Sequence, residues 1–302
     1  MMCDSFINRF FFEPISARPF LRMRTLWAFA TFGTLLMQWN DVVWFYSSES
    51  FLLLQPDVFS LSVFPRFSLL HSITDPGMIF SFYLALLASL LCVFFGFVER
   101  FALIIAVILL HSFHYRNPLP MGGGDVLLYN IGFLLMVTPT VRHKTFARFL
   151  VSRFLLRNEQ PENKQQTTMP VWPYRLLLFQ IIILYLSSLW WKLLGETWMN
   201  GTAVEIAFRN PEFARFIFPP QLLHLLSPIL SYGTMLFELC WILLLIPRFK
   251  YHERLKATLI IIGIFFHLGI AVFLEVGSFG AALFVAYLGL WSKHGGTHRT
   301  TS

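Results

Sequence analysis

Long apolar segments alternate with short polar stretches along most of this chain. About 20 apolar residues suffice for a helix to cross a bilayer, and on that scale we identify eight candidate spans. The third, fourth and eighth of them are short and have polar flanks. The pattern predicts an all-α fold, a polytopic integral membrane bundle of about eight transmembrane helices. The candidate spans are 24–45, 77–96, 101–115, 125–140, 173–195, 222–247, 255–274 and 276–291.

The distribution of basic residues predicts how the spans are oriented. With both termini on the cytoplasmic side, 18 of the 23 Lys and Arg residues lie on the inner side and 4 on the outer side. The remaining one is Lys192, inside the fifth candidate span. Cytoplasmic segments of membrane proteins are enriched in Lys and Arg. The asymmetry therefore predicts cytoplasmic termini and an even number of spans.

The candidate spans fall into two groups of four, separated by a polar stretch that includes RNEQPENKQQTTMP. We interpret this stretch as a flexible, basic cytoplasmic loop between two halves. The outer loops 41–76 and 196–221 are interpreted as surface-lying segments rather than domains. The predicted organisation is a cytoplasmic N-terminal segment at 1–20, a transmembrane domain at 21–292 with halves 21–140 and 173–292 joined by loop 141–172, and a short cytoplasmic tail at 293–302.

Composition favours a membrane protein and argues against nucleic-acid binding. Hydrophobic residues make up 56% of the chain and charged residues 13%, about half the charged fraction of an average soluble protein. The net charge of +7 is explained by basic residues beside the spans, so we expect the lipid bilayer as partner and no nucleic acid. We expect an uncleaved first span and a multi-pass location, in the cytoplasmic membrane if the source is bacterial. The odd count of three cysteines indicates no disulfide framework.

The most unusual charge is Lys192, near the outer end of the fifth span. It follows Trp190 and Trp191 in the stretch YLSSLWWKLLGETWMNG. A charge in the hydrocarbon region is costly, so an ionisable residue there is a candidate for function. The alternative interpretation is that Lys192 extends to the interface and anchors the helix end. The sequence leaves both interpretations open.

A second polar group lies between the third and fourth spans, in HSFHYRNPLPMGGGD. His111 and His114 are three residues apart and share one helix face. Asn117 precedes the proline that ends this helix, and Asp125 begins the next one. The segment is either a capped hairpin with interfacial histidines or an active-site loop of the outer leaflet that includes Arg116. A metal site is not predicted, because His-x-x-His lacks the i, i+4 spacing of zinc-protease helices and a clear third ligand.

Two further polar residues lie inside candidate spans. His267 lies in the outer half of the seventh span. Glu238 lies deeper, in the sixth, and we expect it to be neutral or paired with His267 or an arginine. Most intramembrane polar residues thus converge on the outer half, which predicts one site reached from the outer leaflet, whereas a transport path would need polar residues at all depths. The triplet Arg-Asn-Pro at 116–118 recurs at 209–211 in unrelated surroundings, and we interpret the recurrence as chance.

Three stretches of the chain resemble a known family. They are FHYRNPLPMGGGDVLL, LYLSSLWWKLLGETWMNGTAVEIAFRNPEFARF and FHLGIAVFLEVGSFGAALF, in that order. They are similar to the HTTM family, the transmembrane domain shared by the vitamin K-dependent gamma-carboxylases and many short bacterial membrane proteins. The resemblance covers the chain from about Arg18 to Trp291, and its most specific part is the lysine segment followed by W-x-x-G.

The resemblance implies a chemistry for Lys192. In the carboxylases, a lysine of the matching segment is held to deprotonate vitamin K hydroquinone, and Lys192 corresponds to it by position. An amine in a desolvated apolar site can accept a proton from a phenolic quinol. Lys192 is therefore predicted as the catalytic base and a reduced quinone as the implied cofactor, with Trp191 and Trp198 packing on its ring. The residues expected to orient the ligand or neutralise charge are His111, His114, Arg116, Asn117, Asp125 and His267.

Two classes of function stay open within this family. The carboxylases carry a large soluble domain after the membrane domain, whereas this sequence stops at Ser302 and is more similar to the short bacterial members. We therefore expect the helical scaffold and the proton-abstracting site without gamma-carboxylation of a peptide. Some short relatives act in the maturation of exported toxin peptides. The alternative is accordingly a non-catalytic maturation or scaffold partner for an exported peptide or another membrane protein.

Overall fold

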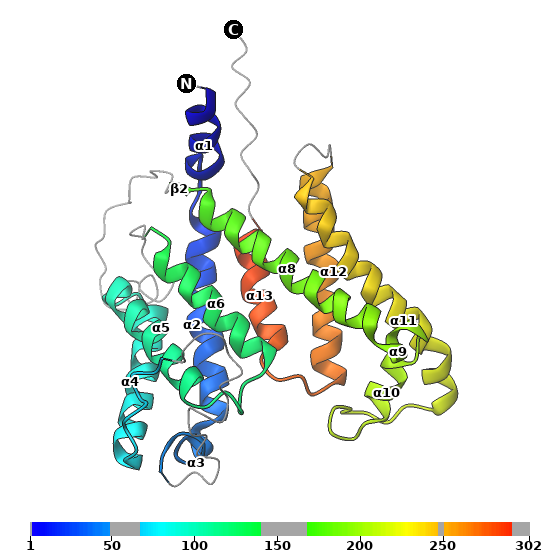
Figure 1. The fold of residues 1–302 in the computed structure, drawn as a ribbon, viewed down its shortest axis with the longest axis horizontal. Coiled ribbons are helices and arrows are strands. Elements are labelled where there is room, and N and C mark those ends of the chain that lie inside the picture. Colours follow the sequence, from blue (N-terminus) through cyan, green and yellow to red (C-terminus); the bar gives the residue numbers. More distant parts are fainter. Residues whose placement is uncertain (1, 49–66, 140–167, 247–250, 292–302) are drawn as a thin grey trace, which may run out of the picture. The chain divides into compact units, whose positions relative to one another are not determined.

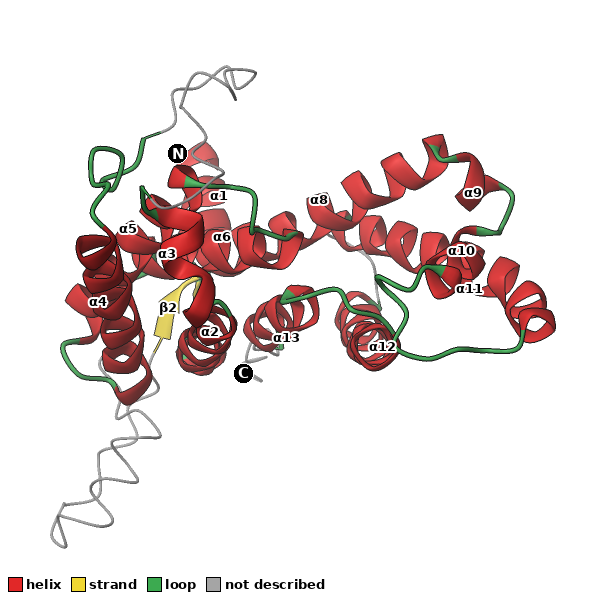
Figure 2. Cartoon of the chain, turned by 90° about the horizontal axis from the view of Figure 1, so that it is seen from below, coloured by secondary structure: helices red, strands yellow, loops and turns green. Residues whose placement is uncertain are grey.

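The structure is a computed structural model of the 302-residue chain, and it describes residues 2–48, 67–139, 168–246 and 251–291. Helices make up nearly all of its regular structure (Figure 2). The chain divides into two compact units, which we describe one at a time. The N-terminal unit is Ser16–Met169, and the C-terminal unit combines Met1–Ile15 with Pro170–Ser302.

The N-terminal unit is a bundle of four long helices. Helix α4 packs against both α2 and α5, and α6 packs against the same two neighbours (Figure 1). Two short helical turns, η1 and α3, follow α2, and α3 packs on α4. The elements are α2 (Arg18–Met37), η1 (Trp39–Asp41), α3 (Val42–Tyr46), α4 (Pro76–Phe95), α5 (Glu99–Arg116) and α6 (Gly123–Val137).

Local sequence signals account for the ends of these helices. Asp75 caps α4, because its carboxylate accepts the backbone N–H of Met78 at 2.7 Å, which satisfies a donor that has no partner inside the helix. The helix ends at Gly96, whose φ of 75° is the left-handed conformation that glycine adopts without cost. In the core, the Trp27 indole N–H donates to the Leu128 carbonyl at 2.7 Å. The ring has room because residue 132 is glycine, where a Cβ would come within 2.5 Å of the indole.

The C-terminal unit is built around α8. This helix packs against α11, η3 and α13, while α12 packs against α13 and η3 (Figure 1). The first helix of the chain, α1, belongs to this unit and packs on α8, where the Arg175 guanidinium lies 4.2 Å from the centre of the Phe10 ring. The elements are α1 (Met2–Phe12), α8 (Trp172–Leu194), α9 (Glu196–Met199), α10 (Ala203–Arg209), α11 (Pro220–Cys240), η3 (Trp241–Leu245), α12 (His252–Phe273) and α13 (Phe279–Leu290).

Strand structure is minor in the part of the chain that the structure describes. Strand β1 (Pro14–Ser16) and strand β2 (Thr168–Pro170) form one two-stranded sheet. The prediction of an essentially all-α, membrane-type protein is confirmed. Four of the described helices are long and apolar enough to cross a bilayer, and α6 and α13 are shorter apolar helices. The four long helices are Pro76–Phe95, Trp172–Leu194, Pro220–Leu245 and His252–Phe273.

A helix lies in each of the eight apolar segments, but the number of spans and the side on which the termini lie stay predictions. The first segment differs from the expectation, because the helix that begins at Arg18 ends at Met37 and the chain continues through η1 and α3. Half of the predicted loop at 41–76, most of the loop at 141–172 and the tail at 293–302 fall outside the described residues.

Candidate functional site

One face of α8 carries the polar residues of the lysine stretch. Tyr185, Ser188 and Lys192 are spaced by three and four residues, so they line one side of the helix. The two tryptophans before the lysine face outward from the unit, with Trp190 and Trp191 62% and 73% exposed. Trp191 is therefore not packed among the residues that contact Lys192.

Lys192 forms an ion pair with Glu238 of α11. The Nζ atom lies 2.7 Å from Glu238 Oε1, and the two side chains are 15% and 5% exposed. Lys192 Nζ also donates to Ser188 Oγ at 2.6 Å, and Ser188 Oγ donates to the same carboxylate oxygen at 2.9 Å. The three side chains form a closed triangle of hydrogen bonds between α8 and α11. We call Ser188, Lys192 and Glu238 the lysine cluster.

Trp198 completes the surroundings of the ammonium group. Its ring lies 4.8 Å from Lys192 Nζ, which is a cation–π contact. An ammonium group has three N–H donors. The carboxylate, the serine hydroxyl and the indole face supply one acceptor each, so the folded protein surrounds the charge on three sides.

The partner of Glu238 differs from the sequence expectation. We expected a neutral Glu238, or a pair with His267 or an arginine, and the structure pairs it with Lys192. Only one of its carboxylate oxygens takes part. Oε2 is buried and accepts no hydrogen bond from the residues that the structure describes. A buried carboxylate oxygen without a donor is costly, and it is an available proton acceptor.

His267 lies in the same unit as Lys192, in a neighbouring aromatic cluster. Its Nε2 atom is 3.0 Å from the Tyr185 hydroxyl, which also hydrogen bonds to the Tyr287 hydroxyl. The Tyr185 ring stacks on Trp241 with centroids 5.0 Å apart. His267 is 3% exposed. His267 thus hydrogen bonds to Tyr185, which lies one helical turn from Ser188.

A second lysine, which is fully buried, lies at the opposite end of α8 and α12. Lys256 is 3% exposed, donates to the Tyr174 hydroxyl at 2.8 Å and pairs with Glu253 at 2.8 Å. The buried residues between this group and Tyr185 are apolar, so the two polar groups are separated by an apolar layer. Among the described residues of this unit, the apolar layer interrupts the continuous polar path that transport requires. The layer contains Leu177, Ile181, Leu259 and Ile260.

The remaining candidate residues belong to the N-terminal unit. His111 Nδ1 lies 2.8 Å from the Tyr129 hydroxyl. His114 and Asp125 line a small cavity together with Thr31 and Tyr46, and the space inside has room for about one water molecule. Asp125 also caps α6, since its Oδ2 accepts the N–H of the first glycine of the Gly-Gly-Gly turn at 2.9 Å.

Arg116 and Asn117 donate hydrogen bonds to backbone carbonyl groups of α3 and of the segment at Leu70. The Arg116 guanidinium donates to the carbonyl groups of Tyr46 and Leu70. The Asn117 amide donates to the Phe45 carbonyl at 2.9 Å. Both side chains thereby hold α3 against the end of α5, and Arg116 also holds the chain at Leu70 there. Burial raises the pKa of the Tyr46 phenol above its ordinary value, so this hydroxyl stays protonated at neutral pH.

The recurring Arg-Asn-Pro triplet forms the same turn twice. Asn117 Oδ1 accepts the backbone N–H of Leu119 at 3.0 Å, and Asn210 Oδ1 accepts that of Glu212 at 3.0 Å. Each asparagine stands directly after the last residue of a helix. Both copies of the triplet thus end a helix with the same asparagine turn, in which the side chain replaces a backbone acceptor.

The structure brings together some of the predicted site residues and assigns others to a separate unit. Lys192, Trp198 and His267 belong to the C-terminal unit, and the five residues between 111 and 125 belong to the N-terminal unit. Sequence reasoning missed the role of Ser188, although its i−4 spacing from Lys192 was a readable signal. Within the described residues, no three His, Cys, Asp or Glu side chains are grouped to hold a metal ion.

Comparisons with known proteins place these clusters in a family context. A family model described as the HTTM domain matches residues 26–292, a range that includes the lysine cluster and the 111–125 segment. The chain is 21% identical over 271 residues to the sporulation-delaying protein SdpB of Bacillus subtilis (strain 168), and the alignment covers 88% of this chain and 78% of that protein. No solved structure matches the chain.

Proposed function

The chain belongs to the HTTM family, as its motifs predicted, and from this premise we propose that it is a multi-pass membrane protein that binds a reduced quinone or a similar lipid-like hydroxyl compound beside Lys192. The observation that carries the proposal is the buried ion pair between Lys192 and Glu238 in helices of membrane-spanning length. We further propose eight spans with cytoplasmic termini, which would set the lysine cluster in the outer half of the bilayer.

The energetic cost of the pair supports a functional role. Two charges in a low-dielectric interior lose more hydration energy than their attraction returns unless further hydrogen bonds support them. Hydrophobic residues of similar volume would hold α8 and α11 together at lower cost. Charged residues inside membrane segments are accordingly candidates for chemistry. The orphan oxygen Oε2 of Glu238 adds to this cost and supports a role in accepting a proton.

The proposed step is a proton transfer shared by the two residues. The pair exchanges between ammonium with carboxylate and amine with carboxylic acid, and in the second state the amine of Lys192 is a base. The O–H bond of the quinol breaks, its proton forms a new N–H bond on Nζ, and the proton held by Glu238 stays on the carboxylic acid. The products are a quinolate anion, an ammonium group and a neutral Glu238, so one proton and its charge are accounted for.

The test is quinol binding by purified protein in nanodiscs, with a short-chain benzoquinol as the probe. We expect wild type to bind and deprotonate the quinol, and Lys192→Met to bind it without deprotonation, because the base is lost and the apolar walls remain. Trp191→Phe is the matched control, since it changes an exposed neighbour. Absence of quinol binding to all three proteins would refute the proposal.

A non-catalytic role is the second candidate, and a specific observation favours it. All three N–H groups of Lys192 have partners within the fold, which is the arrangement that a purely structural pair requires. In that case the protein would be a maturation or scaffold partner for an exported peptide or another membrane protein. The charge-swapped variant Lys192→Glu/Glu238→Lys separates the two, because it retains a pair and moves the amine to α11. Full function of this variant in cells would support the structural role.

A further inference from the structure

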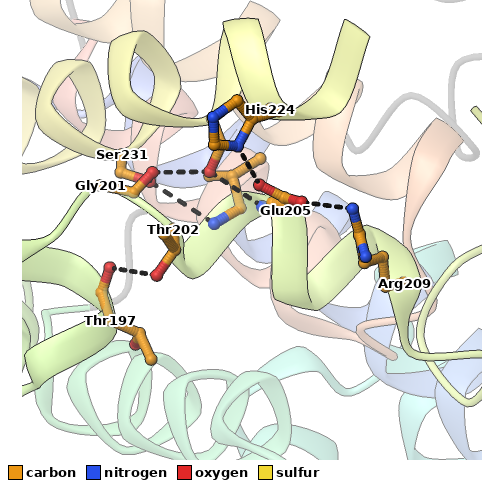
Figure 3. A network of polar contacts seen from close by, with 9 residues as sticks. Thr197, Gly201, Thr202, Glu205, Arg209, His224 and Ser231 are labelled. Atoms are coloured by element: carbon orange, nitrogen blue, oxygen red, sulfur yellow. Dashed lines mark hydrogen bonds and ion pairs between the residues drawn. The ribbon is translucent and has the colours of Figure 1, made fainter. Parts of the chain in front are cut away.

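Three hydroxyl groups on one side of α11 hold the segment that follows α8. Ser227 Oγ donates to the Gly201 carbonyl at 2.7 Å and accepts the backbone N–H of Glu205 at 3.0 Å. Ser231 Oγ accepts the N–H of Val204 at 3.4 Å. These bonds supply acceptors for two N–H groups in the first turn of α10, which have none inside the helix. Figure 3 shows this contact from close by, with Ser231, Gly201 and Glu205 labelled.

The third hydroxyl fixes the same segment two residues earlier. The Tyr232 hydroxyl donates to the Met199 carbonyl at 2.8 Å. We call Ser227, Ser231 and Tyr232 the α11 clasp. Both serines are at most 1% exposed, so their hydrogen bonds are shielded from solvent and are costly to leave unmade.

Gly201 permits the close approach on which the clasp depends. Its φ of 72° lies in the left-handed region, and an added Cβ would come within 3.0 Å of Pro228 on α11. A side chain at this position would therefore meet both backbone strain and a collision. The chain after α9 thus packs closely against α11 at Pro228. The two clasp serines, Ser227 and Ser231, lie on either side of this proline and one helical turn apart.

The clasped segment carries the residue that covers Lys192. Trp198 immediately precedes Met199, whose carbonyl receives the Tyr232 hydrogen bond, and its ring lies over Nζ. Helix α11 also contributes Glu238, the ion-pair partner of the same lysine. One helix therefore controls two of the three contacts of the ammonium group, one directly and one through the backbone at 199–205.

We propose that the α11 clasp positions Trp198 as a fixed cover over Lys192, and that a ligand reaches the amine by taking the place of the indole face. The carboxylate and hydroxyl contacts are charge-assisted hydrogen bonds and are stronger than the cation–π contact. The indole contact is thus the one that a ligand displaces at least cost. Ser227, Ser231 and Tyr232 are positioning residues in this scheme, since their hydroxyl groups bond to the backbone of the segment that carries Trp198.

The cover also selects the class of ligand, and this part rests on the proposed function. A molecule that enters between Nζ and Trp198 needs a thin, flat body to lie along the indole and an oxygen at its edge to meet the amine. Planar hydroxy-aromatic compounds have this shape and gain stacking with the ring. A branched or saturated alcohol of the same size gains no such contact and is expected to bind more weakly.

The test of the cover measures the reactivity of Lys192 itself. The protein in nanodiscs is treated with a water-soluble N-hydroxysuccinimide ester, and acylation of each lysine is followed by peptide mass spectrometry. A net hydrogen bond is worth about 1 kcal/mol. Loss of one clasp hydrogen bond should therefore raise the population of the state in which Trp198 has moved away from Nζ by about five-fold. We therefore expect Lys192 to react about five-fold faster in Ser227→Ala and in Tyr232→Phe than in wild type.

Two controls make the outcome decisive. Ser187→Ala removes a hydroxyl that bonds only to its own helix, at the Leu184 carbonyl, and is expected to leave the rate at Lys192 unchanged. Lys256, buried in the same unit, reports on loosening of the whole unit. Unchanged reactivity of Lys192 in both clasp variants would overturn the proposal, and so would an equal acceleration at Lys256.

A second pair of variants separates the cover from the ligand. Trp198→Phe keeps a flat ring, whereas Trp198→Leu does not. We expect the leucine variant alone to expose Lys192 to acylation and to lose affinity for the benzoquinol by about ten-fold, the scale of one aromatic contact. If Lys192 is acylated faster in Trp198→Leu than in Trp198→Phe while neither the wild type nor any variant binds quinol, the positioning role stands and the proposed function is wrong. Equal rates of Lys192 acylation in the two variants would contradict the proposal that the Trp198 ring covers Lys192.

Discussion

The ion pair between Lys192 and Glu238 predicts a characteristic pattern of stability in single and double variants. Lys192→Met removes one member of a pair whose side chains are 15% and 5% exposed. The abandoned carboxylate keeps the Ser188 hydrogen bond on Oε1 and has no described partner on Oε2. Removal of one partner of a buried pair costs about 3–5 kcal/mol, and the partial exposure of Lys192 places the expected loss at about 3 kcal/mol, the low end.

The double variant Lys192→Met/Glu238→Leu should recover most of this loss. It replaces both charges by apolar groups of similar volume, so no uncompensated charge remains, and such replacements are often neutral or stabilising. The assay is reversible unfolding in mixed micelles with increasing SDS, followed by circular dichroism. The reasoning would be refuted if Lys192→Met matched wild type in stability, or if the double variant were as unstable as the single one.

Three further predictions follow from individual contacts. Gly132→Ala should destabilise the N-terminal unit by about 1–3 kcal/mol, the usual cost of overpacking, because the new Cβ meets the Trp27 indole; a thermal melt measures it, and an unchanged melting temperature contradicts the packing. Tyr185→Phe should cost about 1–3 kcal/mol through the groups left unpaired while keeping the Trp241 stack, as SDS unfolding can show. Arg116→Lys should make the chain near Leu70 more sensitive to proteolysis, because an ammonium cannot reproduce the fork of guanidinium donors; a cleavage pattern identical to wild type would argue against the clamp.

The positions of the helices were predictable because a membrane helix is encoded locally. The apolar run around α8 was predicted at 173–195, and the helix is Trp172–Leu194. Length and hydrophobicity decide such a segment without tertiary information. The first segment was less predictable, since hydropathy continues past Met37 while the helix does not. Apolar side chains at 42–46 continue the pattern in a separate short helix.

The site was predictable in part, and the limit lies in long-range pairing. Lys192 stood out because an isolated charge in an apolar run is rare. Its partner Glu238 is 46 residues away on another helix, and no periodicity encodes which of several polar residues will face it. Arg116 and Asn117 illustrate the opposite case. Their pattern suggested a reactive loop, yet their side chains bond to backbone carbonyls, which local sequence cannot reveal.

The ultraviolet spectrum of the quinol bound at neutral pH shows directly whether Lys192 acts as the base. A deprotonated quinol absorbs at longer wavelength than the neutral form, so the spectrum reports whether a proton has moved. We expect the quinolate band with wild type and the neutral spectrum with Lys192→Met at matched occupancy. The same spectrum with both proteins would contradict Lys192 as the base.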